Sequence, residues 1–202
     1  MMDAILIGKI ICILIVSYLL GGLSFGWFVS NAKGINILNE GSGNPGFTNV
    51  WRTLGIKYGI IALIGDATKG FLAVFFGGYF LDDLGMALAL VMVVFGHSFS
   101  YMLHFKGGKG IATAAGALLY ISPVAVLVCF IVLVILVAIT KYMSVGSISV
   151  AILCPIIMFI TGEPPVLVGT ITILAMYIIW LHRGNIKRLV NGTENKIGMK
   201  RS

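Results

Sequence analysis

Long apolar stretches alternate along the chain with short segments rich in glycine, asparagine, serine and basic residues. A helix needs about 20 apolar residues to cross the hydrocarbon core of a bilayer. The pattern predicts seven spanning helices, at residues 5–29, 56–80, 84–103, 111–121, 124–140, 145–161 and 165–182. The fourth is short. Because residues 112–140 are almost uninterrupted, the fourth and fifth could instead form one segment of a six-span protein.

Composition agrees with a membrane protein. The chain of 202 residues is 59% hydrophobic and 10% charged, whereas a soluble domain carries about 25% charged residues. We therefore predict an all-α, polytopic integral membrane protein, with residues 1–202 forming a single membrane-embedded domain. The first apolar stretch resembles a signal peptide, but it has no basic leading region and no evident cleavage site. Three cysteines in apolar runs argue against a disulfide framework.

The distribution of basic residues decides between six and seven spans. With seven, one side of the membrane receives nearly all Lys and Arg, and the other side receives Asp3, Asp82, Asp83 and Glu163. The positive-inside rule then predicts an N-terminus outside and a C-terminus in the cytoplasm. The net charge of +7 indicates a basic face beside anionic lipid, with no nucleic acid as partner. The basic residues on that side are Lys33, Arg52, Lys57, Lys106, Lys109, Lys141, Arg183, Lys187, Arg188, Lys196, Lys200 and Arg201.

The first polar segment on the basic side reads GSGNPGFTNVWR, residues 41–52. Its glycines permit positive φ and close backbone approach, so that several N–H groups can converge on an anion. Ser42 and Thr48 add hydroxyls, and Arg52 can give two parallel hydrogen bonds to a phosphate. An ordinary loop between membrane helices explains the same composition, because Gly, Asn, Ser and Pro dominate turns.

Two further segments lie on the same side. HFKGGKG, residues 104–110, sets Lys106 and Lys109 around a glycine pair before a helix, which suits a phosphate at a helix N-terminus. Residues 182–196 place His182 and Asn185 three apart, on one face if helical. The alternatives are simple basic flanking for the first segment and a solvated basic tail for the second. A serine-rich stretch, residues 143–149, is explained equally well by helix packing.

Charged residues also occur inside the predicted spans. Asp66 and Lys69 lie three apart in the second span, where a structural ion pair and a role in a site are both open. His97 lies near the cytoplasmic end of the third span, where a hydrogen-bonded packing residue is the simpler interpretation.

The chemistry is narrowed by the motifs that the sequence lacks. There is no HExxH motif, paired CxxC or carboxylate cluster for a metal, no GxSxG motif, and no His followed by Asp five residues later. We expect no metal and no cofactor. A site rich in cations and N–H donors favours an anionic substrate, with phosphate the best candidate, and catalysis by positioning and charge stabilisation.

Together the three segments resemble the bacterial acyl-phosphate:glycerol-3-phosphate acyltransferases. That family has motifs like GSGNxGxTNxxR, GH…FKGGKGxAT and HRxNIxRLxxGxE; here they read GSGNPGFTNVWR (41–52), GH…FKGGKGIAT (96–113) and HRGNIKRLVNGTE (182–194). The resemblance covers nearly the whole chain. It implies a seven-span enzyme of the bacterial inner membrane, with its active site facing the cytoplasm. Such an enzyme moves a fatty acyl group from acyl phosphate to the sn-1 hydroxyl of glycerol 3-phosphate, giving lysophosphatidate and phosphate, the first step of phospholipid synthesis.

The resemblance also implies the site residues. As catalytic residues it gives Ser42, Arg52, Lys109, Ser144, His182 and Asn185, with Glu194 as a supporting acid. We expect substrate contacts from Gly41, Gly43, Asn44, Gly46, Thr48, Asn49, His97, Lys106, Gly107, Gly108 and Gly110. Two departures put the local backbone bend in doubt: Ser100 stands where the family commonly has Pro, and His104 where Gly is usual.

An acyl phosphate already carries a good leaving group, so we expect direct attack by the glycerol hydroxyl. Either His182 or the departing phosphate takes the proton. The enzyme that forms acyl phosphate is the expected functional partner. The main alternative is a small membrane transporter of an organic phosphate or anion. Against it, the motifs lie at one face of the membrane and not at its midplane, and no inverted repeat is evident. A non-catalytic membrane scaffold would not need Ser42, Arg52 and His182.

Overall fold

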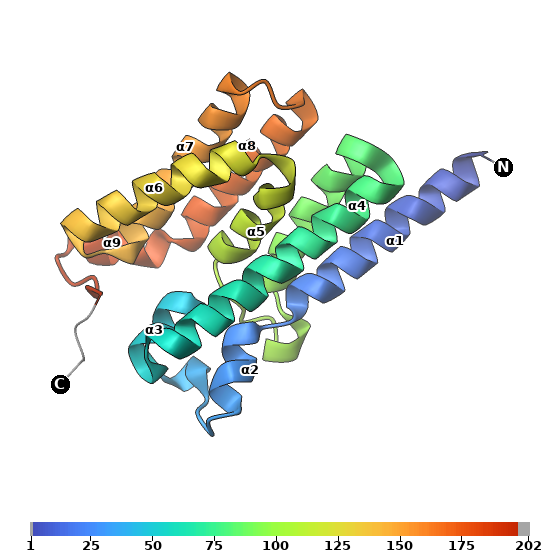
Figure 1. The fold of residues 1–202 in the computed structure, drawn as a ribbon. Helices are drawn as coiled ribbons and strands as arrows, with labels where there is room; N and C mark the ends of the chain where they lie inside the picture. Colours follow the sequence, from blue (N-terminus) through green and yellow to red (C-terminus); the bar gives the residue numbers. More distant parts are fainter. Residues whose placement is uncertain (1, 198–202) are drawn as a thin grey trace. The chain divides into compact units, whose positions relative to one another are not determined.

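The computed structural model describes residues 2–197, and within that part the regular secondary structure is entirely helical (Figure 1). Lys200 and Arg201, counted above toward the basic tail, lie outside the described residues. The α-helices are α1 (Met2–Gly22), α2 (Phe25–Asn31), α3 (Phe47–Leu54), α4 (Ile56–Ser98), α5 (Ile111–Ile121), α6 (Pro123–Thr140), α7 (Met143–Ile160), α8 (Pro165–Leu181) and α9 (Arg183–Val190), with short 3₁₀ turns at Ile37–Asn39 and Tyr101–Leu103.

Four helical stretches are long and apolar enough to cross a membrane: Asp3–Asn31, Ile56–Leu103, Pro123–Thr140 and Met143–Ile160. Helices α8 and α9, bent by 53° at their junction, make a fifth if they are counted as one span. The predicted all-helical membrane protein is therefore confirmed. The seven spans and their orientation stay a prediction, because α5 is a short apolar helix and Ile56–Leu103 passes as one stretch.

That stretch of 48 residues would be roughly 72 Å long if straight, more than twice the thickness of a bilayer core. It is not straight. Leu81 and Asp82 leave the helical conformation, and Asp82 has a φ of +44°. Gly77 and Gly85 lie so close that a side chain on either would meet the other's backbone carbonyl. The chain therefore turns back at Asp82, and α4 consists of two arms.

The first span also contains a break that the sequence pattern does not predict. Residues 5–29 were expected as one helix, but α1 ends at Gly22, and α2 starts at Phe25 with Ser24 accepting a hydrogen bond from the Trp27 N–H. Side chains from distant positions satisfy the carbonyls at the break. Ser100 Oγ donates to Gly22 O at 2.5 Å, and Lys69 Nζ donates to Leu23 O.

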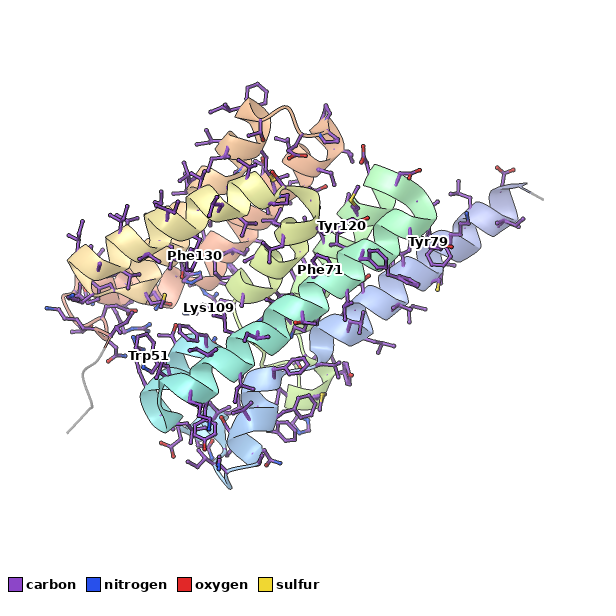
Figure 2. The ribbon with its side chains drawn as sticks, viewed as in Figure 1. Trp51, Phe71, Tyr79, Lys109, Tyr120 and Phe130 are labelled. Atoms are coloured by element: carbon purple, nitrogen blue, oxygen red, sulfur yellow. The ribbon has the colours of Figure 1, made fainter. Side chains whose placement is uncertain are left out.

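The chain divides into two compact units, with the boundary between Ile121 and Ser122. In the first unit α1 and α5 both lie along α4 (Figure 1). Glycines make these contacts close: a side chain at Gly21 would meet the Val93 carbonyl, and one at Gly116 would meet the Ala67 carbonyl. Small residues at membrane helix contacts let backbones approach in this way. Phe71 on α4 packs edge-on against Tyr120 of α5 (Figure 2).

In the second unit, α7 packs between α6 and α8, and α9 follows α8 directly. The segment after α9 returns to the turn between α6 and α7, where the Ile197 N–H donates to Lys141 O at 2.8 Å. Large apolar side chains such as Phe130 and Phe159 are exposed on this unit, as lipid-facing residues are. The prediction that the whole chain is one membrane-embedded domain stays a prediction.

Candidate functional site

The segment between the 3₁₀ turn at Ile37–Asn39 and α3 is shaped by one buried amide. Asn49 is 2% exposed. Its Nδ2 donates to the carbonyls of Glu40 (2.9 Å) and Ile37 (3.3 Å), and its Oδ1 accepts from the Ser42 N–H (3.0 Å). Gly41 has a φ of +56°, and a side chain there would collide with the same Oδ1. Asn49 therefore holds this loop in shape from beneath.

Helix α3 starts from a second asparagine turn. Asn44 Oδ1 accepts from the Gly46 N–H at 2.9 Å, the hydrogen bond typical of an Asx turn. The loop leaves Ser42 exposed and Thr48 half-buried. Arg52 is half-buried in the last turn of α3. The segment thus presents the hydroxyl of Ser42 and the guanidinium of Arg52, while the side-chain amides of its asparagines hold the backbone in shape.

The glycine pair of the second segment is tied to the end of α4. The Gly107 N–H donates to Ser98 O and the Gly108 N–H to His97 O, both at 3.0 Å. These N–H groups therefore cap helix carbonyls, and the predicted contact of the two glycines with substrate stays a prediction. Gly110 has a φ of +82° and leads into α5.

Lys106 is exposed, whereas Lys109 is half-buried directly before the first turn of α5 (Figure 2). The first turn of a helix carries unpaired N–H groups and a partial positive charge, which together favour an anion. Lys109 adds a full charge at that position. The arrangement suits a phosphate group.

A charged cluster lies behind this segment, inside α4. Lys69 Nζ is 2.8 Å from Asp66 Oδ1 and 2.9 Å from His97 Nδ1, and all three side chains are at most 5% exposed. Asp66 and Lys69 thus form an ion pair, which was one of the two interpretations that the sequence left open. His97 is the third member of the cluster. The sequence offers no signal for that third member, because 28 residues separate it from Lys69.

In the second unit the carboxylate of Glu194 accepts hydrogen bonds from residues of the third motif and from Ser144. Glu194 Oε1 accepts from Ser144 Oγ (2.9 Å) and Asn185 Nδ2 (2.7 Å), while Oε2 accepts from Arg188 Nε (2.7 Å). The structure therefore brings together three residues that the sequence nominated, from α7, α9 and the segment after α9. Arg188 was missed as a site residue, although its place three positions after Asn185 on a helix could have revealed it.

Burial acts to raise the pKa of the Glu194 carboxyl. The hydrogen bonds from Asn185, Arg188 and Ser144 outweigh burial, with the charge of Arg188 adding to them, and the net pKa lies below its ordinary value. The carboxylate is thus a permanent acceptor at neutral pH. It fixes the Asn185 amide with Nδ2 toward itself.

His182, at the end of α8, is buried, and its Nδ1 is 2.8 Å from the Ile178 carbonyl oxygen. A carbonyl only accepts, so Nδ1 carries the proton and Nε2 of the neutral ring is an acceptor. Among residues 2–197 no group of three or more His, Cys, Asp or Glu side chains is placed to hold a metal ion.

Comparison with known proteins identifies the family to which this chain belongs. Residues 11–192 match the family model described as glycerol-3-phosphate acyltransferase. A glycerol-3-phosphate acyltransferase of Clostridioides difficile (strain 630) is 43% identical over 199 residues, covering 95% of this chain and 97% of that protein. The chain belongs to the glycerol-3-phosphate acyltransferase family.

Other members of the glycerol-3-phosphate acyltransferase family agree. The protein of Trichlorobacter lovleyi is 42% identical, over 89% of this chain and 93% of its own. The fold also matches PlsY, solved as an integral membrane glycerol 3-phosphate acyltransferase in its glycerol 3-phosphate form. The TM-score is 0.90 and the identity 34%, with 94% of this chain and 96% of that chain covered. The family to which the sequence motifs pointed is thus confirmed.

Proposed function

We propose that this chain transfers a fatty acyl group from acyl phosphate to the sn-1 hydroxyl of glycerol 3-phosphate, giving lysophosphatidate and phosphate. The observation that carries the proposal is the fold match to a solved glycerol 3-phosphate acyltransferase at a TM-score of 0.90. The family's name, shared by relatives at 40% identity or more over nine tenths of the chain, supports the acceptor. The donor rests on the sequence motifs.

The first unit supplies groups suited to the two phosphates. Arg52 on α3 and Lys109 at the start of α5 bind phosphate oxygens, and Ser42 orients a reacting oxygen. Lys106 and the first turn of α5 add to the positive potential. An acyl phosphate is already activated, so the glycerol hydroxyl attacks the acyl carbon directly, the carbon–oxygen bond to phosphate breaks, and phosphate leaves with the electron pair. Fixed cations stabilise the charge that develops.

His182 and Asn185 of the second unit act on the acceptor hydroxyl. The Nδ1–H of His182 is held by Ile178 O at 2.8 Å, which leaves Nε2 with the lone pair that a general base requires. Glu194 fixes Asn185 and Ser144 from behind. The departing phosphate is the competing proton acceptor. His182→Gln separates them: a His base predicts a loss of about 100-fold or more in kcat, and near-normal turnover assigns the proton to phosphate.

We further propose seven spans, with the N-terminus outside and the C-terminus and active site facing the cytoplasm of the bacterial inner membrane. The two arms of α4 and the short α5 supply the spans that length alone does not count. Single cysteines placed at Asp83 and at Lys187 in a chain lacking its own cysteines test this arrangement. A membrane-impermeant thiol reagent added outside must label the first and spare the second. The enzyme that produces acyl phosphate is the proposed functional neighbour, since it supplies the donor.

The activity is tested with purified protein in detergent or proteoliposomes, given acyl phosphate and glycerol 3-phosphate. Phosphate release and lysophosphatidate must appear in equal amounts. Arg52→Gln and Lys109→Gln should each lower kcat/KM by about 100-fold or more through loss of a charge at phosphate. The matched control is Lys187→Gln, an exposed cation on α9, which should leave turnover unchanged. Folded protein that forms no product, but moves an organic phosphate into vesicles, would establish a transporter instead.

A further inference from the structure

The ammonium group of Lys69 is surrounded by three acceptor atoms. It is 2% exposed in α4 and lies 2.8 Å from Asp66 Oδ1 and 2.9 Å from His97 Nδ1. Its third contact is the carbonyl of Leu23, at the break between α1 and α2. An ammonium has three N–H donors and no acceptor; two of its contacts here are hydrogen bonds, and the contact with Asp66 Oδ1 is an ion pair. Lys69 is therefore held by its neighbours in the fold.

This environment decides which nitrogen of His97 carries the proton. Because the ammonium can only donate, Nδ1 must accept, and the proton of the neutral ring lies on Nε2. Asp66 Oδ1 lies 3.7 Å from His97 Nδ1, whereas Lys69 Nζ lies 2.9 Å from it. The ammonium is therefore the nearer neighbour of Nδ1. The buried pair thus fixes a tautomer, as an outer partner does for a histidine that binds a metal.

The opposite side of the His97 ring lies against the glycine-rich segment. A side chain at Gly108 would overlap His97 Nε2, so the ring occupies the space that this glycine leaves. The Gly108 N–H donates to the His97 carbonyl at 3.0 Å, which locks the two backbones together. Within residues 2–197 the contacts of the ring with charged side chains, Lys69 and Asp66, are both made by Nδ1. The Nε2–H donor is therefore beside Gly108, next in the chain to Lys109.

We propose that Asp66 and Lys69 are positioning residues that hold His97 as its Nε2–H tautomer, so that this N–H donates to an oxygen of the phosphate bound beside Lys109. The inference rests on the proposed function and deepens it. Lys69 acts through the ring and touches no substrate, and Asp66 supplies the charge that keeps the ammonium in place. His97 itself contacts the substrate.

Nitrogen-15 NMR of histidine-labelled protein reads the tautomer directly. The chain has three histidines, and the spectrum of His97→Asn identifies the His97 signal by its loss. At pH 7.5 wild-type His97 should show a protonated Nε2 and a bare Nδ1. In Lys69→Met, Nδ1 faces the Asp66 carboxylate and should take up the proton. In Asp66→Asn, Lys69 still donates to Nδ1 and the wild-type tautomer should remain.

Kinetics with both substrates give the second measurement. Lys69→Met should lower kcat/KM by about tenfold to 100-fold, as loss of an orienting partner does, whereas Asp66→Asn should cost less. His97→Gln, which carries an N–H₂ near the Nε2 position, should retain more activity than His97→Asn, which keeps only the group facing Lys69. The control is His104→Asn, an exposed position in the left-handed region that asparagine tolerates, and its turnover should match wild type.

Lys69→Met leaves a buried carboxylate without its counter-ion, so the double variant Asp66→Asn/Lys69→Met removes both charges together. It should show mixed tautomers at His97 and the same kinetic loss. A wild-type ring protonated at Nδ1, an unchanged tautomer in Lys69→Met and in the double variant, or full activity in both would each overturn the proposal. Wild-type protein that has the expected tautomer but forms no lysophosphatidate would instead overturn the proposed function.

Discussion

Two buried histidines of this chain have their Nδ1 atoms beside opposite kinds of group. Nδ1 of His97 faces the Lys69 ammonium at 2.9 Å, and Nδ1 of His182 faces the Ile178 carbonyl at 2.8 Å. The ammonium can only donate and the carbonyl can only accept. Nε2 is therefore a donor in His97 and an acceptor in His182. In the proposed function, the same side chain donates to an anion in one unit and takes up a proton in the other.

The charges that support the two rings are arranged differently as well. Around His97 the cation is central, and its partners come from α4 and the end of α1. Near His182 the carboxylate of Glu194 is central, and it receives three donors, one from α7 and two from α9. In the first cluster the charge acts on the ring itself. In the second it acts on Asn185, three residues further along the chain.

The largest effect is expected at Glu194. Glu194→Ala removes the acceptor of Ser144, Asn185 and Arg188 at once and should lower the free energy of unfolding by about 3 kcal/mol. Because Asn185 is then no longer oriented, kcat/KM should fall by about 100-fold or more. Thermal unfolding in detergent and the transfer assay measure the two effects. Glu194→Gln keeps a carbonyl acceptor and should lie between Ala and wild type, and equal activity for all three proteins would contradict the role of the carboxylate.

The glycine pair beside His97 should show a smaller, separable effect. A side chain at Gly107 would meet the carbonyls of His97 and Ser98, whereas the three atoms nearest to one at Gly108 all belong to the imidazole ring of His97. Gly107→Ala should therefore lower Tm, because backbone has to move. Gly108→Ala should lower Tm less, through the lost contact of the ring with Lys69, and cost about tenfold in kcat/KM by turning the ring away.

Gly169→Ala in α8, with open space around it, is the matched control. It should be neutral or stabilising by about 0.5 kcal/mol. If Gly108→Ala behaved like this control in both Tm and turnover, the contact between His97 and the glycine-rich segment would have no functional weight.

The smallest effect is the pH dependence of the Glu194 cluster. The folded-state pKa of Glu194 lies below its ordinary value, which is about 4.3 in an unfolded chain. The stabilisation that the ionised Glu194 gives to the folded protein is therefore complete above the pKa of Glu194 in the unfolded chain. It is lost as pH falls through the pKa of Glu194 in the folded protein. The Tm difference between wild type and Glu194→Gln should be constant from neutral pH down to about pH 5 and shrink below about pH 4. A difference that grows on acidification would reverse the assigned direction.

Much of this architecture follows from local pattern. The predicted segments 111–121, 124–140, 145–161 and 165–182 match α5 to α8 within two residues at each end, since long apolar runs leave few alternatives in a bilayer. Glycine at positions 41, 43 and 110 also agrees with positive φ values there.

Long-range contacts were not predictable. The first span breaks after Gly22 because Ser100 and Lys69 satisfy the carbonyls that the helix gives up. The third predicted span extended to residue 103, but α4 ends at Ser98, where the glycine pair caps its carbonyls. Each case depends on a partner brought close only by the finished fold, and no spacing in the sequence encodes it.

The reversal at Asp82 has a consequence for how the protein is made. Two apolar arms joined by so tight a turn enter a bilayer together, because a single arm would leave the other in water. The polar groups that must cross the bilayer with the turn are one turn of backbone and the carboxylates of Asp82 and Asp83. With Gly77 and Gly85 already in backbone contact, the arms can pair during insertion. The cluster of Asp66, Lys69 and His97, which is divided between those arms, would then be assembled during biosynthesis, before the second unit emerges from the ribosome.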